Sequence, residues 1–419
     1  MNTVAKQGRV AVDPEVYKWK ALIGVVAGYV VDAIDFMVLA MALPLLIKEW
    51  EISLVSAGLL STATLIGAAI GAYSWGPIAD KFGRKYVLAI CIGGFSLLTG
   101  FCGLAQNWEQ LMILRFLCGC VLGGYWVVGA ACVTEYFPPH QRARATAGIH
   151  MGWPVGFAIV IVANLLLTPS YGWRALFFFG GVGVLVAIYV LLFVPESPAW
   201  IKAKENLKKG ITGTSATVSS ATKWTDIFKG SNLRVTLLSM SLCVCVLVSF
   251  WGTNTWIPAF LVQERGLDIR GLTWFLLAQQ GAGIISYVVF GFIGDKIGRR
   301  ANFIIGGLLS TVAVILYMMA PTAGLILAAG IFWAFAMLGF WGPLPATVAE
   351  QYPTSVRGFG LSMSYGTGRL ASAVAPFLIG GLGATYGLAF AIGLMAVFYI
   401  GVSLFGFLMK ETKNTVVVD

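Results

Sequence analysis

The sequence predicts an all-α membrane protein with twelve transmembrane helices, arranged as two pseudo-symmetric bundles of six. Three observations support this fold class. Of the 419 residues, 58% are hydrophobic and only 11% are charged, whereas about 25% of residues are charged in soluble domains. Apolar runs of about twenty residues, each long enough to cross a hydrocarbon core about 30 Å thick, recur along the whole chain. Finally, motifs of the first half return in the second half at one fixed offset.

The apolar runs, taken in chain order, predict where each helix begins and ends. The first run follows a polar segment and has full length, so we expect it to remain in the membrane and not to be cleaved as a signal peptide. The longest polar stretch is rich in Ser, Thr and Lys and predicts a flexible linker between the halves. The helices are expected at 19–47, 53–78, 86–105, 109–134, 145–168, 173–195, 234–262, 271–294, 301–320, 323–348, 358–382 and 385–409. The expected domains are an N-terminal segment at 1–18, a bundle at 19–195, the linker at 196–233, a second bundle at 234–410 and a tail at 411–419.

The distribution of basic residues predicts the orientation of the chain in the membrane. Of the 28 Lys and Arg residues, most lie in the terminal segments, the linker and the loops on the same side as the termini. The exceptions are Lys48, Arg174, Arg265 and Arg270 on the other side, and Arg115 and Arg369 inside helices. Because loops rich in Lys and Arg stay in the cytoplasm, both termini are predicted to be cytoplasmic in a multi-pass protein of the bacterial inner (plasma) membrane.

Charge and cysteine content exclude several classes of function. The net charge of +10 is explained by the orientation signal, so it does not indicate nucleic-acid binding. The seven cysteines lie in apolar runs without the spacing of metal ligands or disulfides. The chain does not combine a nucleophile with a base, and it contains no metal-ligand cluster or phosphate-binding loop. We therefore predict no enzyme activity, catalytic residue, metal or cofactor.

The repeat links the halves at a single offset in residue number, the one that separates Gly76 from Gly291. It includes two loop motifs of one form, Gly76 to Lys85 and Gly291 to Arg300. Seven identical pairs share the offset: Gly76 and Gly291, Asp80 and Asp295, Gly83 and Gly298, Arg84 and Arg299, Glu135 and Glu350, Pro138 and Pro353, and Arg142 and Arg357. Parallel six-helix repeats of this kind are the architecture of the major facilitator superfamily, and the two loops resemble its cytoplasmic motif. The resemblance implies a cytoplasmic gate formed by Asp80, Arg84, Glu135, Arg142, Asp295, Arg299, Glu350 and Arg357. The alternative is that the basic residues among them only set the topology.

Two carboxylates in the first predicted helix are candidates for proton coupling. At the helical rise, Asp32 lies about 20 Å and Asp35 about 24 Å from the cytoplasmic end of the helix. A carboxylate at such depth must be paired, hydrated or protonated, so a change of protonation is a usable switch. The second half carries Leu247 and Phe250 at the equivalent positions, so the repeat does not explain the carboxylates. The alternative is a structural ion pair without a role in transport.

Two arginines inside predicted helices complete the set of buried charges. Arg115 lies about 9 Å from the outer end of the fourth helix, a depth that matches Asp35, which we predict to be its partner. Arg369 lies about 16 Å along the eleventh helix, close to the midplane, with no acidic residue on that helix. A buried guanidinium of this kind suits a ligand carboxylate, which it binds through two parallel hydrogen bonds. The alternative is that Arg369 pairs with Asp32 in the empty protein.

Aromatic and amide side chains at similar depth are candidates for the wall of a substrate cavity, because they offer flat faces and hydrogen bonds. By depth, we rank Gln279 and Tyr365 first. His150, near the cytoplasmic end of the fifth helix, is expected to have a structural role. The candidates are Tyr125, Trp126, Trp153, Gln279, Gln280 and Tyr365.

Five further motifs are distinctive in the first half: Asp32-Ala-Ile-Asp35-Phe36-Met37, Thr134-Glu135-Tyr-Phe-Pro138-Pro139-His-Gln-Arg142, Gly152-Trp153-Pro154-Val155-Gly156, Tyr171-Gly172-Trp173-Arg174 and Val194-Pro195-Glu196-Ser197-Pro198-Ala-Trp200. They resemble one branch of the major facilitator superfamily, the proton symporters for sialic acid, aromatic acids and related organic acids. The resemblance implies a monomeric carrier for proton-coupled uptake of a small organic or aromatic carboxylate by alternating access. In such a carrier, the residues that couple transport to the proton are Asp32, Asp35 and Arg115, and Arg369 binds the carboxylate. The alternative is a multidrug or metabolite exporter of the same fold. Exporters usually carry a Gly-Pro pair in the fifth helix, which Trp153 interrupts here.

Overall fold

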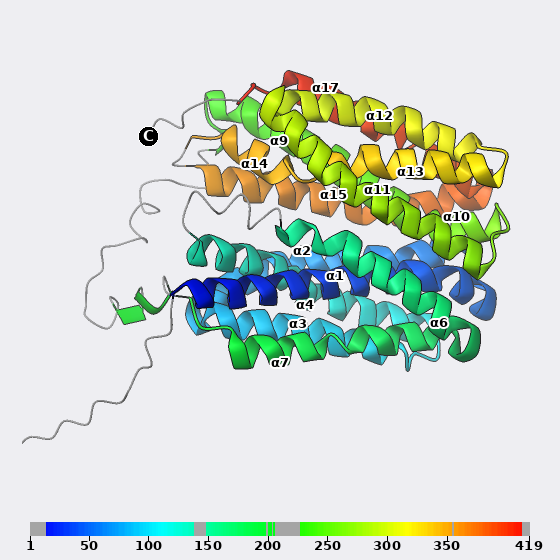
Figure 1. The fold of residues 1–419 in the computed structure, drawn as a ribbon, viewed down its shortest axis with the longest axis horizontal. Coiled ribbons are helices and arrows are strands. Elements are labelled where there is room, and N and C mark those ends of the chain that lie inside the picture. Colours follow the sequence, from blue (N-terminus) through cyan, green and yellow to red (C-terminus); the bar gives the residue numbers. More distant parts are fainter. Residues whose placement is uncertain are drawn as a thin grey trace, which may run out of the picture.

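The computed structural model describes residues 14–137, 148–197, 200–202, 204–205, 227–353 and 356–412. Over these ranges the regular secondary structure is helical throughout. Figure 1 shows the first half (blue to green) as one bundle and the second half (yellow-green to red) as another bundle beside it. The first helix begins, and the last helix ends, at the same end of the molecule. We call this end the termini face and the other end the opposite face.

The first half contains six membrane segments in six labelled helices. One labelled helix, α6, holds the fifth segment and the first part of the sixth, which α7 completes, because the backbone at Gly172 leaves the helical conformation with φ 69° and ψ −172°. Glycine adopts a positive φ without the strain that a Cβ would cause. The break falls where the sequence predicts the turn between the fifth and sixth helices. The helices are α1 (Pro14–Trp50), α2 (Leu54–Phe82), α3 (Arg84–Cys102), α4 (Trp108–Tyr136), α6 (Gly152–Gly181) and α7 (Val184–Phe193).

The second half also contains six membrane segments, three of which are interrupted. The seventh consists of α9 and α10, the tenth of α13 and α14, and the twelfth of α16 and α17. In the tenth, Pro343 directly precedes α14, and a proline has no N–H to continue the ladder of hydrogen bonds from α13. The helices are α9 (Ser231–Asn254), α10 (Ile257–Gln263), α11 (Ile269–Lys296), α12 (Arg299–Met319), α13 (Ala323–Gly339), α14 (Leu344–Glu350), α15 (Arg357–Tyr386), α16 (Leu388–Gly393) and α17 (Ala396–Leu408).

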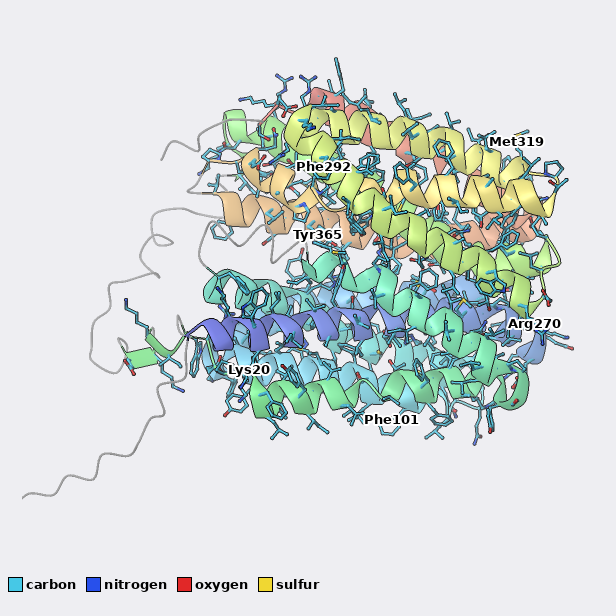
Figure 2. All side chains as sticks on the ribbon, viewed as in Figure 1. Lys20, Phe101, Arg270, Phe292, Met319 and Tyr365 are labelled. Carbon is cyan, nitrogen blue, oxygen red and sulfur yellow. The ribbon has the colours of Figure 1, made fainter. Side chains whose placement is uncertain are left out.

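The predicted number of twelve membrane segments is confirmed. By length and composition alone, nine stretches of the described chain are apolar enough to cross a membrane. One of them, Gly148–Phe193, holds the two segments that meet at Gly172, and α4 and α15 complete the set. The outer surface agrees with this reading, because large apolar side chains project from it. Phe101, Phe292 and Met319 are 52%, 62% and 74% exposed and lie on different helices in Figure 2.

A half-buried carboxylate joins the end of the first bundle to the start of α3. The Oε1 atom of Glu196 accepts hydrogen bonds from the backbone N–H groups of Arg84 at 2.8 Å and Lys85 at 3.1 Å. Gly83 makes this approach possible, since a Cβ there would lie 2.3 Å from the Oε2 atom of Glu196. A carboxylate at a helix N-terminus satisfies unpaired N–H groups and interacts favourably with the helix dipole.

The second bundle repeats this arrangement. Glu411 accepts hydrogen bonds from the backbone N–H groups of Arg299 at 2.9 Å and Arg300 at 3.1 Å, and a Cβ on Gly298 would lie 2.3 Å from its Oε2 atom. Glu411 follows Glu196 at the same offset that relates the two loop motifs. The repeat is therefore structural as well as sequential, and it includes two capping carboxylates that sequence analysis did not single out.

The two halves meet tightly near the opposite face, where α2 packs against α15. A Cβ on Gly58 would lie 2.5 Å from the carbonyl oxygen of Pro376, and one on Gly380 would lie 2.4 Å from that of Leu54. Such small residues let helix backbones touch in a membrane. The space between the halves is therefore closed on this side.

Candidate functional site

A small cavity lies between the two halves. It is walled by α1, α4 and α6 from the first half and by α9, α11, α15 and the turn between α13 and α14 from the second. The volume within which the centre of a water-sized sphere can move is about 20 Å³. The cavity therefore has room for about one water molecule. One arginine is the only charged residue of a lining that is otherwise aromatic. The lining residues are Tyr29, Trp126, Trp153, Phe250, Trp251, Tyr287, Trp341, Tyr365 and Arg369.

Arg369, on α15, places in this cavity a cation that no described carboxylate contacts directly. Its side chain is 5% exposed, and the described residues offer its guanidinium neither a hydrogen bond nor an ion pair. Its Cζ atom lies 6.0 Å from the ring centroid of Trp126, within the range of a cation–π contact. The predicted alternative, a resting ion pair between Arg369 and Asp32, is not present in the described structure. A guanidinium is always charged, so the cavity is suited to an anion.

Asp32, on α1, is the second unsatisfied group at the interface. It is fully buried, and within the described ranges neither carboxylate oxygen has a hydrogen-bond partner. The charged groups close enough to act on it are Arg369 and Asp35, and the indole of Trp126 approaches it without hydrogen-bond geometry. Because an unpaired buried charge is costly, this position favours a carboxyl group that can be neutralised by a proton.

Asp35 is satisfied, in contrast to Asp32. Its Oδ1 and Oδ2 atoms accept hydrogen bonds from Nη1 of Arg115 at 2.9 Å and from Nη2 at 3.1 Å. The hydroxyl of Thr99 and the thiol of Cys118 also donate to Oδ1, and Nε of Arg115 donates to Thr64 at 3.2 Å. Both charged side chains are almost fully buried. The predicted partnership of Asp35 and Arg115 is therefore confirmed.

The second half fills the equivalent place with neutral groups. Gly330 is the repeat counterpart of Arg115, and a Cβ on it would lie 2.6 Å from Nε2 of Gln279. That Nε2 donates a hydrogen bond to the hydroxyl of Tyr317 at 2.7 Å. Gln279 and Tyr317 thus occupy the space that a guanidinium occupies in the first half. Gln279, which we ranked first for substrate contact, lies inside the second bundle and is not part of the cavity lining.

The other predicted wall residues divide into two groups. Trp126, Trp153 and Tyr365 line the cavity, whereas Tyr125 and Gln280 do not. The hydroxyl of Tyr125 donates to the carbonyl oxygen of Val25 at 2.5 Å, inside the first bundle. Figure 2 shows Tyr365 on the side of its helix that faces the other half.

Five lining residues were not among the candidates predicted from the sequence. A signal for two of them was available: Tyr29 precedes Asp32 by one helical turn, which places both on one face, and Trp341 is the repeat counterpart of Trp126. His150 approaches the site from the termini face, where its Nδ1 lies 3.4 Å from the hydroxyl of Tyr29. The five are Tyr29, Phe250, Trp251, Tyr287 and Trp341.

Aromatic rings of the two halves approach one another on both sides of the cavity. Towards the opposite face, the ring centroids of Phe36 and Trp251 lie 4.4 Å apart, and Trp153 packs on Trp251 at 5.9 Å. Phe36 and Trp251 are themselves repeat counterparts. Towards the termini face, Trp126 and Tyr365 face each other at 6.2 Å. Aromatic side chains of both halves therefore border the cavity on both sides.

The predicted gate is described only in part. In the second half, Nε of Arg299 lies 3.7 Å from Oε2 of Glu350, so this pair joins the start of α12 to the end of α14. In the first half, the backbone of Arg84 is bound by Glu196. The side chains of Asp80, Glu135, Asp295 and Arg357, and the whole of Arg142, lie outside the described residues.

Removing one partner of the buried Asp35 and Arg115 pair should destabilise the first bundle. Asp35→Asn leaves a buried guanidinium without a counter-charge, a loss worth about 3 to 5 kcal/mol in free energy of unfolding. Asp32→Asn is the matched control, because Asp32 has no partner to lose. Thermal unfolding in detergent should show a marked drop in melting temperature for Asp35→Asn only. Equal drops for both variants would contradict this assignment.

Comparisons with known proteins agree with this architecture. The family model described as Major Facilitator Superfamily matches residues 25–286 and 272–417. The chain is 31% identical over 390 residues to the cis,cis-muconate transport protein of Acinetobacter baylyi, covering 92% of this chain and 93% of that one. It is 27% identical over 372 residues to the niacin transporter NiaP of the same organism, covering 84% of each chain. Among solved structures, the inward open xylose transporter XylE from E. coli superposes with a TM-score of 0.76 at 19% identity, covering 96% of this chain and 98% of that one. That structural likeness concerns the fold alone.

Proposed function

Because the chain belongs to the major facilitator superfamily and is thus a membrane transporter and not an enzyme, we propose that it is a proton symporter that takes up a small organic or aromatic carboxylate. The observation that carries the proposal is the guanidinium of Arg369, which has no direct partner in an aromatic cavity and lies within electrostatic reach of the buried carboxyl group of Asp32. The cavity lies between the two halves, where transporters of this fold bind their cargo and alternate its access.

A carboxylate ligand would complement the positive charge that Arg369 places in the cavity. Arg369 offers a planar fork that holds a carboxylate through two parallel hydrogen bonds. The surrounding rings bury flat apolar surface at low conformational cost. The two relatives are named for muconate and niacin, and both compounds are planar carboxylic acids, which supports the same class of cargo here.

Asp32 is the preferred proton site. When the cavity is closed, a proton on Asp32 removes the cost of an unpaired charge. When water reaches the cavity, the same carboxyl group can release its proton. Asp35 and Arg115 remain candidates for the proton route. Because each already neutralises the charge of the other, the pair is better suited to holding α1 against α4.

The orientation and the gate complete the proposal. The excess of Lys and Arg on the termini face supports cytoplasmic termini in a bacterial inner membrane. The pair of Arg299 and Glu350, with the other predicted gate residues, would then hold the cytoplasmic face shut in the outward-open state and separate as that face opens.

A screen of labelled organic acids in proteoliposomes tests the proposed function. Purified protein should take up one or more planar acids faster than protein-free liposomes, and an inward proton gradient should drive accumulation. Neutral amides of the same acids are the matched controls, because they lack the charge that Arg369 binds. Failure to carry any acid, together with outward transport of cationic compounds, would overturn the proposal in favour of an exporter.

A further inference from the structure

Trp341 lines the cavity with an indole N–H that has no acceptor. Its side chain is 8% exposed, and the described part of the chain offers its Nε1 no hydrogen bond. An unsatisfied buried N–H is unfavourable, because the group has lost its hydrogen bonds to water without gaining an acceptor in the protein. Other buried indoles avoid this cost: Nε1 of Trp256 donates to the carbonyl oxygen of Pro376 at 3.0 Å, and that of Trp333 donates to the hydroxyl of Tyr399 at 3.2 Å.

The position of Trp341 in the fold points independently to a ligand. It stands at the break in the tenth membrane segment, between the end of α13 at Gly339 and the start of α14 at Leu344. Irregular backbone inside a membrane is tolerated where it lines a cavity, and broken helices form the binding sites of many transporters. Its repeat counterpart Trp126 lies in the uninterrupted helix α4.

Two separate donors therefore serve one cavity. Arg369 comes from α15 and Trp341 from the break in the tenth segment, and both line the cavity together with aromatic rings. Phe250 packs against the ring of Trp341 with centroids 4.8 Å apart, which limits the rotation of the indole. A ligand held by its carboxylate at one point can accept a hydrogen bond at the other.

We propose that the indole N–H of Trp341 is a second anchor for the substrate. The carried acid then bears, besides the carboxylate bound by Arg369, a hydrogen-bond acceptor such as a ring nitrogen, a hydroxyl oxygen or a second carboxylate. This inference rests on the proposed function and narrows it from planar acids in general to planar acids with a second acceptor. Sites built around a buried donor reject analogues that leave the donor unpaired.

Four planar acids, each with one six-membered aromatic ring and one carboxylate, test the inference: benzoate, nicotinate, isonicotinate and 4-hydroxybenzoate. Benzoate lacks a second acceptor, and the other three carry one at different places. The wild-type protein should bind at least one of the three about tenfold more tightly than benzoate, and Trp341→Phe should bring the ratio of the two affinities close to one. Affinities are measured by calorimetry or by competition with a labelled acid.

Trp333→Phe is the matched control, because it removes a buried indole N–H that serves Tyr399 and lies outside the cavity lining. This variant should keep the wild-type ratio even if it lowers overall stability. A ratio that Trp341→Phe leaves unchanged, or equal binding of all four acids by the wild type, overturns the inference but leaves carboxylate transport standing. Binding of none of the four, with no uptake of any acid in the wider screen, contradicts the proposed function itself.

Discussion

Asp32→Asn is expected to abolish accumulation of the acid against its gradient, while exchange of internal for external acid continues. The fully buried carboxyl group of Asp32 has no hydrogen-bond or ion-pair partner in the described structure, and a proton would neutralise it directly. Asn resembles the protonated acid in shape and polarity but cannot release a proton. The carrier should then cycle only with substrate bound.

The size of the effect follows from the driving force. With one proton per acid, each unit of pH difference supports about tenfold accumulation in the wild type, because one unit equals about 1.4 kcal/mol. Asp32→Asn should show a ratio of about one at any gradient. Counterflow of labelled acid into preloaded liposomes is the control that the variant still binds and cycles. Accumulation at the wild-type ratio would remove Asp32 from the proton route.

Arg369→Ala is expected to weaken binding of the acid by roughly tenfold to a hundredfold, which corresponds to about 1.5 to 3 kcal/mol for a charge-assisted hydrogen bond. The guanidinium of Arg369 has no partner in the described parts of the chain, so its removal breaks no internal ion pair. Arg369→Lys keeps the charge but loses the planar fork, so its affinity should lie between those of the wild type and Arg369→Ala.

A comparison of each acid with its neutral amide separates recognition from folding. If Arg369 binds the carboxylate, Arg369→Ala should lower the binding affinity for the acid strongly and that for the amide only slightly. The loss of the packing between Arg369 and Trp126 would instead affect both ligands alike. Equal losses for acid and amide would therefore show that Arg369 serves to hold the helices together.

The fold could be predicted from the sequence because the membrane strongly limits the structures that a chain can adopt. Runs of apolar residues fix the helices, and the single offset of the repeat fixes the relation of the halves. Depth along a helix was also enough to pair Asp35 with Arg115, because these two opposite charges lie at the same height in adjacent helices and each neutralises the other. The predictions that succeeded are those in which one coordinate, the distance along the helix, decides the contact.

Which of the predicted wall residues line the cavity depends instead on the direction in which each side chain points around its helix. Gln279 and Tyr125 lie at suitable depth, yet each faces the inside of its own bundle and bonds to Tyr317 or to the backbone of Val25. The space that Gln279 fills exists because Gly330 lacks a side chain, a fact that depends on the packing of three helices. The capping role of Glu196 likewise depends on how the chain returns to α3 after α7.

Proton movement that accompanies the acid, with no imposed pH gradient, tests the central claim most directly. Proteoliposomes hold a trapped pH indicator and have their membrane potential clamped with potassium and valinomycin, and a labelled acid of low passive permeability is added outside. The interior should acidify as the acid enters, in a fixed ratio of protons to acid that protein-free liposomes do not reproduce, and Asp32→Asn should admit acid only by exchange and without acidification. Entry of the acid through the wild-type protein with no change in internal pH would contradict proton symport.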